Sequence, residues 1–313
     1  MARLAVVVPC RDAPQLELCL RALRTGSRRP DELIVVDDGS RTAPWVPSDV
    51  QLLRQPHRGP AVARNAGVRL TTAEILIFVD ADVEVRTDTL ARFEALLHRE
   101  PAIAAVQAIY AADCPVPTFA ARLQNVLQRE NLLAVGDTLF AGLSSFCVAL
   151  RREAFESVGG FDERFDRPTI EDDNLGLALA AQGRRIVIAR DIEVRHHARP
   201  TVPSLLLRMV RMAEDRVQTA EDAAVLPTRT HHRPELLVAT GLMGLAMVSS
   251  PAVPVALALS GAAIAVQSRW LKAAKDTYGT RFAVAAAPML AALPAAAAIG
   301  VRRGLARRLK KLV

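Results

Sequence analysis

The sequence predicts an α/β protein with a doubly wound, mostly parallel sheet and helices on both faces, followed by hydrophobic C-terminal helices that are expected to be transmembrane. Residues 4–8, 33–36 and 75–79 are short branched-aliphatic runs without polar alternation, which is typical of strands buried on both faces of a parallel sheet. Between these runs, residues 15–24 and 61–70 have helical spacing of apolar residues. Regular alternation of strand and helix favours the doubly wound class.

Positive charge is concentrated in the last quarter of the chain. The whole sequence of 313 residues carries a net charge of +7, but from Glu235 onward ten basic residues face two acids, a local charge of +8. The preceding part is close to neutral, at −1. Because the basic part is also the most hydrophobic, the charge predicts contact with membrane lipids and excludes nucleic acid as the expected partner.

Two long stretches without charge dominate this basic part, residues 236–268 and 282–301. A bilayer core of about 30 Å needs about 20 apolar residues as helix, so membrane segments are predicted at about 236–266 and 282–301. Pro251 lies inside the first stretch, which leaves a kinked helix or a re-entrant hairpin open. The alternatives are a monotopic arrangement, because the connecting loop carries four basic residues, and buried core helices of a soluble protein.

The predicted domain order follows from these segments. Residues 1–225 form an N-terminal domain, 226–235 a juxtamembrane linker, 236–301 the membrane segments and 302–313 a basic amphipathic tail. The first eleven residues have too short an apolar run for a signal peptide, so the N-terminal domain is expected to face the cytoplasm from the inner (cytoplasmic) membrane. Four cysteines without paired spacing predict neither a disulfide framework nor a zinc module.

Polar residues follow each of the three predicted strands, at residues 9–12, 37–40 and 80–82. The carboxyl ends of parallel strands meet at one edge of a sheet, so their aspartates should converge there. Clustered carboxylates repel one another unless a cation neutralises them, and Mg²⁺ or Mn²⁺ suits such ligands together with substrate phosphates. A single aspartate at a strand end is more often a turn residue or a helix cap, but three successive strand ends favour a site.

The sequence contains no glycine-rich phosphate-binding loop. A bound nucleotide diphosphate would therefore depend on metal and on arginine. Arg58, Arg64 and Asn65 lie in residues 55–67, where a loop is predicted to become a helix and could present donors to an anion.

Six ordered motifs together resemble those of family 2 glycosyltransferases of the GT-A fold. The resemblance implies an inverting enzyme, here with a C-terminal membrane anchor. The resemblance covers about residues 1–220, so it identifies residues 1–225 as a GT-A glycosyltransferase domain. The motifs are Val6-Val7-Val8-Pro9, Val35-Val36-Asp37-Asp38-Gly39-Ser40, Gly59 with Ala63-Arg64-Asn65-Ala66-Gly67, Asp80-Ala81-Asp82, Val158-Gly159-Gly160-Phe161-Asp162-Glu163 and Glu171-Asp172.

The resemblance implies a role for each matched residue. Asp172 would be the catalytic base, and Asp82 the metal ligand of a D-x-D pair. His196, with His197 as second choice, would reach the metal or the diphosphate, although paired histidines are more often loop residues. The donor nucleotide would be held by Pro9, Arg11, Asp12, Asp37, Asp38, Arg64, Asp80 and Ala81, and the acceptor side would include Gly160, Phe161, Asp162 and Glu171.

From the residues alone, Glu171 and Asp172 have a second explanation. Residues 169–172 match the pattern of a helix capping box, which needs no catalysis, and the two interpretations are about even without the resemblance. If Asp172 is catalytic, the positive end of the helix dipole would keep its carboxylate ionised.

The resulting functional expectation is a membrane-anchored inverting transferase that moves one sugar from a nucleotide sugar, a UDP-sugar in the first place, to a hydroxyl of a lipid-linked or membrane-proximal glycan acceptor of the cell envelope. A divalent metal, Mn²⁺ or Mg²⁺, would assist an in-line displacement. The alternatives are a processive polysaccharide synthase, disfavoured by the lack of a correctly spaced Q-x-x-R-W motif, and a non-catalytic nucleotide-sugar-binding scaffold at the membrane.

Overall fold

The computed structural model describes residues 2–134, 143–219, 234–248 and 253–312, and the chain divides into two compact units. The first, here called the sheet unit, comprises Met1–Pro115 and Leu132–Ala198. The second, the helical unit, comprises Val116–Asn131 and Arg199–Val313. Most of the predicted juxtamembrane linker, with its two histidines, lies outside the described residues, and the predicted domain boundaries stay predictions.

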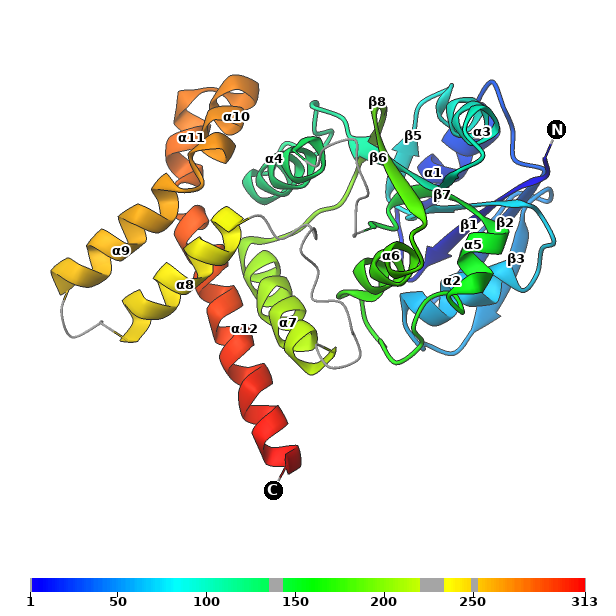
Figure 1. The fold of residues 1–313 in the computed structure, drawn as a ribbon. Coiled ribbons are helices and arrows are strands. Elements are labelled where there is room, and N and C mark those ends of the chain that lie inside the picture. The colour runs from blue at the N-terminus through cyan, green and yellow to red at the C-terminus, as the bar shows by residue number, and fades with distance from the viewer. Residues whose placement is uncertain (1, 135–142, 220–233, 249–252, 313) are drawn as a thin grey trace. The chain divides into compact units, whose positions relative to one another are not determined.

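The sheet unit is built on one eight-stranded sheet of order β3-β2-β1-β4-β7-β6-β8-β5, which Figure 1 shows with helices around it. The predicted fold class is thereby confirmed: an α/β sheet with mostly parallel pairing in its first half, where β1 pairs in parallel with β2 and β4, and β2 with β3. The strands are β1 (Leu4–Cys10), β2 (Glu32–Asp38), β3 (Gln51–Gln55), β4 (Ile75–Val79), β5 (Val83–Val85), β6 (Ile103–Tyr110), β7 (Cys147–Arg151) and β8 (Arg185–His196).

Apolar character explains the central strands. In β4 every residue is buried, and β1 is buried along nearly its whole length, as expected for strands covered on both faces. Helix α2 packs closely on this sheet: a Cβ on Gly67 would lie 2.4 Å from the Val7 side chain. The other helices of the sheet unit are α1 (Leu16–Arg24), α3 (Thr89–Arg99), α5 (Arg152–Ser157) and α6 (Glu171–Ala181), with α2 spanning Pro60–Val68.

Strand β7 runs antiparallel to both of its neighbours, β4 and β6. No pattern in the sequence predicts this reversal. Because of it, the start of β7 meets the carboxyl end of β4 at the same edge of the sheet: Cys147 pairs with Val79, and the amide of Asp80 donates to the carbonyl of Phe146. The segment just before β7 therefore enters the edge where the aspartates gather.

The helical unit contains only helices among its described residues. Three small apolar clusters hold it together rather than one large core. Its helices are α4 (Phe119–Leu133), α7 (Val202–Thr219), α8 (Pro234–Val248), α9 (Val253–Ala265), α10 (Ser268–Tyr278), α11 (Thr280–Ala286) and α12 (Met289–Leu312).

Helices α7 and α12 pack against each other through two glycines. A Cβ on Gly300 would lie 2.2 Å from the carbonyl oxygen of Val210, and one on Gly304 would lie 2.7 Å from the Val217 side chain. Small residues four apart let two helix backbones approach closely. Next to this contact Arg307 pairs with the buried carboxylate of Glu214 at 2.6 Å, so the basic tail is docked on α7 rather than fully solvated.

One helical stretch among the described residues, Thr280–Lys310, is long and apolar enough to cross a membrane by length and composition. Two shorter apolar helices, Leu237–Met247 and Pro254–Ala265, precede it. The first predicted membrane segment is thus two short helices rather than one long one. They lie side by side in Figure 1.

Candidate active site

Asp80, Asp82 and His196 come together at the carboxyl end of β4. One ligand atom from each lies within 4.8 Å of the others, as a shared metal ion requires. The two carboxylates follow β4 directly, whereas His196 is the last residue of β8 and pairs with Val83. Two carboxylate oxygens and one imidazole nitrogen are a donor set that fits Mn²⁺ or Mg²⁺.

The ring of His196 is held in place by its surroundings. Its Nε2 lies 3.2 Å from Asp82 Oδ1, and the ring stacks on Tyr110 with centroids 4.8 Å apart. His197, the second choice from the sequence, points elsewhere and lies 2.9 Å from Glu84. The structure therefore brings the ring of His196 to the aspartate pair, whereas His197 contacts Asp82 only through its backbone amide.

The carboxyl group of Asp82 is ionised more readily than usual. Burial alone would raise its pKa, but the hydrogen bond and charge of His196 outweigh burial, and the net pKa lies below the ordinary value. A negatively charged Asp82 is the form that binds a cation.

Arg64 connects this group to α6. Its buried guanidinium donates to Asp80 Oδ1 at 2.8 Å and to Glu171 Oε1 at 3.2 Å. Arg64 is expected to contact the donor nucleotide, both from its place at a predicted helix start and from the family resemblance. In the structure the guanidinium neutralises protein carboxylates. Burial acts to lower its pKa, but these carboxylates outweigh burial and the net pKa is raised. Contact with a donor nucleotide stays a prediction.

Asp172 lies in the first turn of α6 and is enclosed by hydrogen-bond donors. Its Oδ2 accepts from the Ser145 amide at 3.1 Å and lies 3.4 Å from the Ser145 hydroxyl, and its Oδ1 accepts from the Asp173 amide. Burial, followed by the negative charges of Glu171 and Asp173, raises the pKa of Asp172 to about 7. The sequence predicted that the helix start keeps this carboxylate ionised, but burial opposes it and places the pKa near neutrality.

The capping-box alternative for residues 169–172 is wrong. Helix α6 has Ile170 at its N-cap without a side-chain cap, and the buried hydroxyl of Thr169 has no partner. Glu171 accepts the amide of Thr169 instead, at 2.8 Å, while its other oxygen pairs with Arg64. Glu171 is therefore a buried structural anchor in the sheet unit, next to Asp172.

Ser144 and Ser145 were missed by sequence reasoning. Their only signal is that two small polar residues precede a buried strand, and this becomes meaningful once β7 is known to run antiparallel. Gln107, fully buried in β6, accepts the amide of Ser144 at 2.8 Å and so fixes the loop that carries both serines.

Asp38 and its neighbours organise the loop before α2. The Asp38 carboxylate accepts from the Gln55 side chain and from the amides of Arg58 and Gly59, and also lies 2.7 Å from His57 Nδ1. Two backbone amides that could bind an anion at this helix start, those of Arg58 and Gly59, therefore donate to Asp38. Gly59 is needed here, since it has φ +96° and a Cβ would lie 2.6 Å from the Asp166 backbone.

The remaining predicted donor residues lie along the same edge. Asp37 is fully buried and pairs with Arg54, while Asp12 has φ 45° and its carboxylate accepts from Arg41. Pro9 lies near the end of β1 and is half-buried, and Arg11 follows the strand and is exposed. Ala81, between Asp80 and Asp82 in the sequence, is buried.

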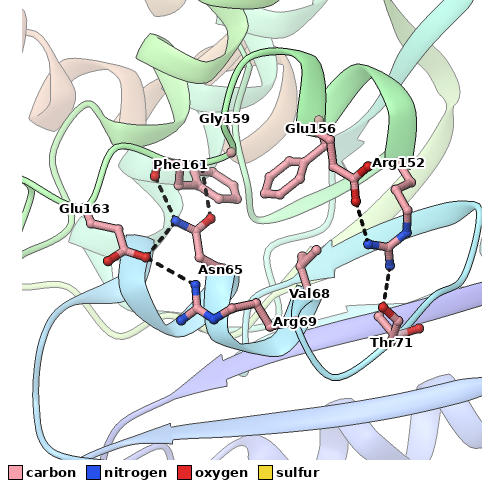
Figure 2. A pocket seen from close by; sticks show the side chains of 11 residues that line it. Asn65, Val68, Arg69, Thr71, Arg152, Glu156, Gly159, Phe161 and Glu163 are labelled. Carbon is pink, nitrogen blue, oxygen red and sulfur yellow. Dashed lines mark hydrogen bonds and ion pairs between the residues drawn. The ribbon is translucent and has the colours of Figure 1, made fainter.

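Asn65 holds the predicted acceptor loop. Its Oδ1 accepts from the Phe161 amide at 3.0 Å, and its Nδ2 donates to the Phe161 carbonyl at 2.8 Å and to Glu163 at 3.1 Å. Figure 2 shows Asn65 facing both partners. Asn65 also lines a pocket of about 650 Å³. Gly160 and Phe161 line this pocket, whereas Asp162 pairs with Arg164, which lowers its pKa although burial acts to raise it.

Comparison with protein families agrees with this geometry. Residues 5–159 match the family model described as glycosyl transferase family 2. The chain belongs to glycosyl transferase family 2 through this domain. The matched range contains the D-x-D pair and ends at Gly159, just before the loop held by Asn65.

Curated relatives extend the likeness at low identity. The O-antigen biosynthesis protein RfbC of Myxococcus xanthus is 28% identical over 234 residues, and the pre-mycofactocin glycosyltransferase of Mycobacterium tuberculosis is 31% identical over 206 residues. These alignments cover 62% and 58% of this chain but only 17% and 40% of the relatives. The chain therefore spans less than half the length of either relative.

Two solved structures share the fold. The mannosyltransferase PcManGT from Pyrobaculum calidifontis, solved in complex with GDP-Man and Mn²⁺, has a TM-score of 0.60 and 21% identity, covering 96% of this chain and 87% of its own. TarS 1–349 of S. aureus has a TM-score of 0.50 and 14% identity, covering 98% of this chain and 92% of its own. The family 2 domain thus has a GT-A-like fold.

Proposed function

We propose that this chain is an inverting glycosyltransferase that moves one sugar from a nucleotide sugar to a hydroxyl group of a membrane-associated acceptor. The observation that carries the proposal is the Arg64 bridge between Asp80 and Glu171. It ties the residues that could hold a metal to the helix that carries Asp172. The residues around Asp80 would then bind the leaving diphosphate through a metal, while Asp172 removes a proton from the acceptor.

Asp172 is the base in this proposal. It accepts the proton of the acceptor hydroxyl as the oxygen attacks the anomeric carbon, on the face opposite the leaving group. The bond between the anomeric carbon and the diphosphate oxygen breaks in the same step, so the configuration inverts. A pKa of about 7 suits a base that works near neutral pH.

Asp80, Asp82 and His196 would hold a divalent metal. When bound, such an ion supplies positive charge to the departing nucleoside diphosphate. In the fold relative PcManGT the structure contains Mn²⁺ and GDP-Man. A UDP-sugar stays the first donor to test for this chain. A GDP-sugar is tested second, because nothing in the described residues distinguishes uracil from guanine.

The test measures release of nucleoside diphosphate from UDP-, GDP- and dTDP-sugars, with a membrane lipid extract as acceptor and with Mn²⁺ or Mg²⁺. The parent chain should turn over one donor, and D172N should lose activity by about 10²–10⁴-fold while it still binds that donor. D173N is the comparison: it keeps the Asp172 carboxylate but removes a charge that raises the Asp172 pKa, so it should stay active with a pH profile shifted to lower pH. Equal activity of D172N and the parent, or no turnover with any donor, would reject the proposal, and donor binding without turnover would favour a scaffold.

A further inference from the structure

Helices α8 and α9 expose large apolar side chains on their outer surfaces. Leu245 is 58% exposed and Leu257 67%, while small residues such as Ala239 and Ala263 pack between the helices. Large apolar side chains therefore lie on the outer surface of the hairpin, where an ordinary soluble hairpin would place polar ones, although Met243 is buried with the alanines. An exposed apolar surface of this kind marks contact with a partner or a membrane.

Over their described residues, neither helix is long enough to cross a bilayer. Helix α8 has 15 residues and α9 has 13. At about 1.5 Å per residue they extend about 22 Å and about 20 Å, short of the roughly 30 Å of a hydrocarbon core. The helices contact each other and are separated by four residues of sequence, so the chain returns toward the side from which α8 began.

Positive charge follows directly after this return. Helix α10 buries Trp270 and Ala274 and leaves Lys272 and Lys275 exposed. Arg281 is also exposed, and Asp276 is the one acid in the segment. An excess of cations beside an exposed apolar hairpin complements the anionic headgroups of a lipid surface.

The long helical stretch of residues 280–310 packs on other helices of its own unit along one side, while residues such as Val284 and Leu305 are exposed. Ala286, Met289 and Leu293 pack against α4 and α7 through residues such as Leu123 and Leu205. Helix α7 carries exposed arginines at positions 208 and 211, and its buried Glu214 pairs with Arg307 of α12. Because charged side chains are costly in hydrocarbon, the part of α12 that packs on α7 is expected to lie outside the hydrocarbon core.

From these observations we propose that the helical unit is monotopic: the α8–α9 hairpin inserts into one leaflet of an anionic bilayer and no segment crosses it. Lys272, Lys275 and Arg281 then lie at the headgroups of that leaflet. This accounts for the basic loop that two crossings would place on the far side. The proposal refines the membrane part of the proposed function and rests on it, but its tests need no catalysis.

The first test is the sidedness of position 272. K272C is introduced together with C114S, because Cys10, Cys19 and Cys147 are buried, and membrane vesicles of both orientations are treated with an impermeant maleimide. Label should reach Cys at 272 from the same side as an N-terminal tag. Labelling from the opposite side would show that the chain crosses the bilayer before position 272 and would overturn the proposal.

The second test is vesicle flotation of purified protein with anionic or neutral phospholipid. The double variant L245D/L257D should bind anionic vesicles at least tenfold more weakly than the parent, and K272E/K275E should lose the preference for anionic lipid. L52D is the matched control, since Leu52 is an exposed leucine of β3, outside the hairpin, at 39% exposure. All variants are first checked for a cooperative thermal transition.

Binding of L245D/L257D equal to that of the parent would overturn the proposal. Evidence that the hairpin serves self-association would also overturn it. In that case the parent chain would form oligomers and would not bind vesicles, and the double variant would be monomeric. Failure of the proposed transferase reaction is distinguishable, because it would leave both labelling and flotation unchanged.

Discussion

Arg64 and Asp80 form a hydrogen bond of 2.8 Å, and the same guanidinium pairs with Glu171 at 3.2 Å. Arg64 and Glu171 are almost fully buried, at 5% and 4% side-chain exposure. Replacement by methionine would leave Glu171 unpaired. We expect R64M to lower the free energy of unfolding by about 3–5 kcal/mol, the usual result of removing one partner of a buried pair.

Urea unfolding measures this loss, and R69M is its control. Arg69 pairs with Glu163 at 3.5 Å with side chains 61% and 38% exposed, so its loss should cost less than about 1 kcal/mol. Equal effects of the two substitutions would mean that the Arg64 bridge does not stabilise the sheet unit.

The pH dependence of transfer should follow Asp172. Its pKa is raised to about 7 by burial and by its acidic neighbours, and only the ionised form can accept a proton. The specificity constant kcat/KM should therefore rise with pH through about 7 and level off above it. A profile that is already flat from pH 5 upward would contradict this assignment.

The same carboxyl group should make stability depend on pH. Because the folded state holds this proton more tightly than the unfolded chain, whose pKa is 3.8, the stabilisation from protonated Asp172 is complete at low pH and is lost as the pH rises through about 7. The uncharged D172N variant should melt higher than the parent at pH 8, and the difference should shrink toward pH 4. Thermal unfolding at both pH values tests this, and a constant difference would argue against the raised pKa.

His196 should determine how tightly metal is held. H196A removes one of three possible ligands, so the Mn²⁺ concentration for half-maximal activity should increase at least about tenfold. Treatment with a chelator should abolish turnover, and added Mn²⁺ should restore it. H197A is the comparison, because His197 faces Glu84, and it should leave the metal requirement close to that of the parent.

The contact of α7 with α12 should depend on Gly300. A methyl group there would lie 2.2 Å from the Val210 carbonyl, so G300A should destabilise the helical unit by about 1–3 kcal/mol. G261A tests the opposite case, since nothing lies within 4 Å of that position on α9, and alanine should be neutral or stabilise by up to about 1 kcal/mol. Calorimetry compares the two, and equal melting temperatures would reject close packing at Gly300.

Much of the sheet unit could be predicted because its signals are local. The branched-aliphatic runs at β1, β2 and β4 place apolar side chains on both faces of each strand, so both faces must be buried. The polar residues that follow these parallel strands then lie at one edge of the sheet. The D-x-D pair was found in this way. Ser145 and the donor loop around Asp38 were not understood from sequence, because their hydrogen bonds join residues 17 or more positions apart.

By itself the sequence determined the α/β class, the convergence of carboxylates at a sheet edge and the separation of a near-neutral domain from a basic, apolar C-terminal part. Composition and short-range periodicity contain this information, since they record which faces must be buried. Tertiary structure decided that Arg64 bridges Asp80 and Glu171, that His196 rather than His197 joins the aspartates, and that the first apolar stretch is two short helices. These outcomes depend on strand direction and on long-range packing, which no local pattern of residues encodes.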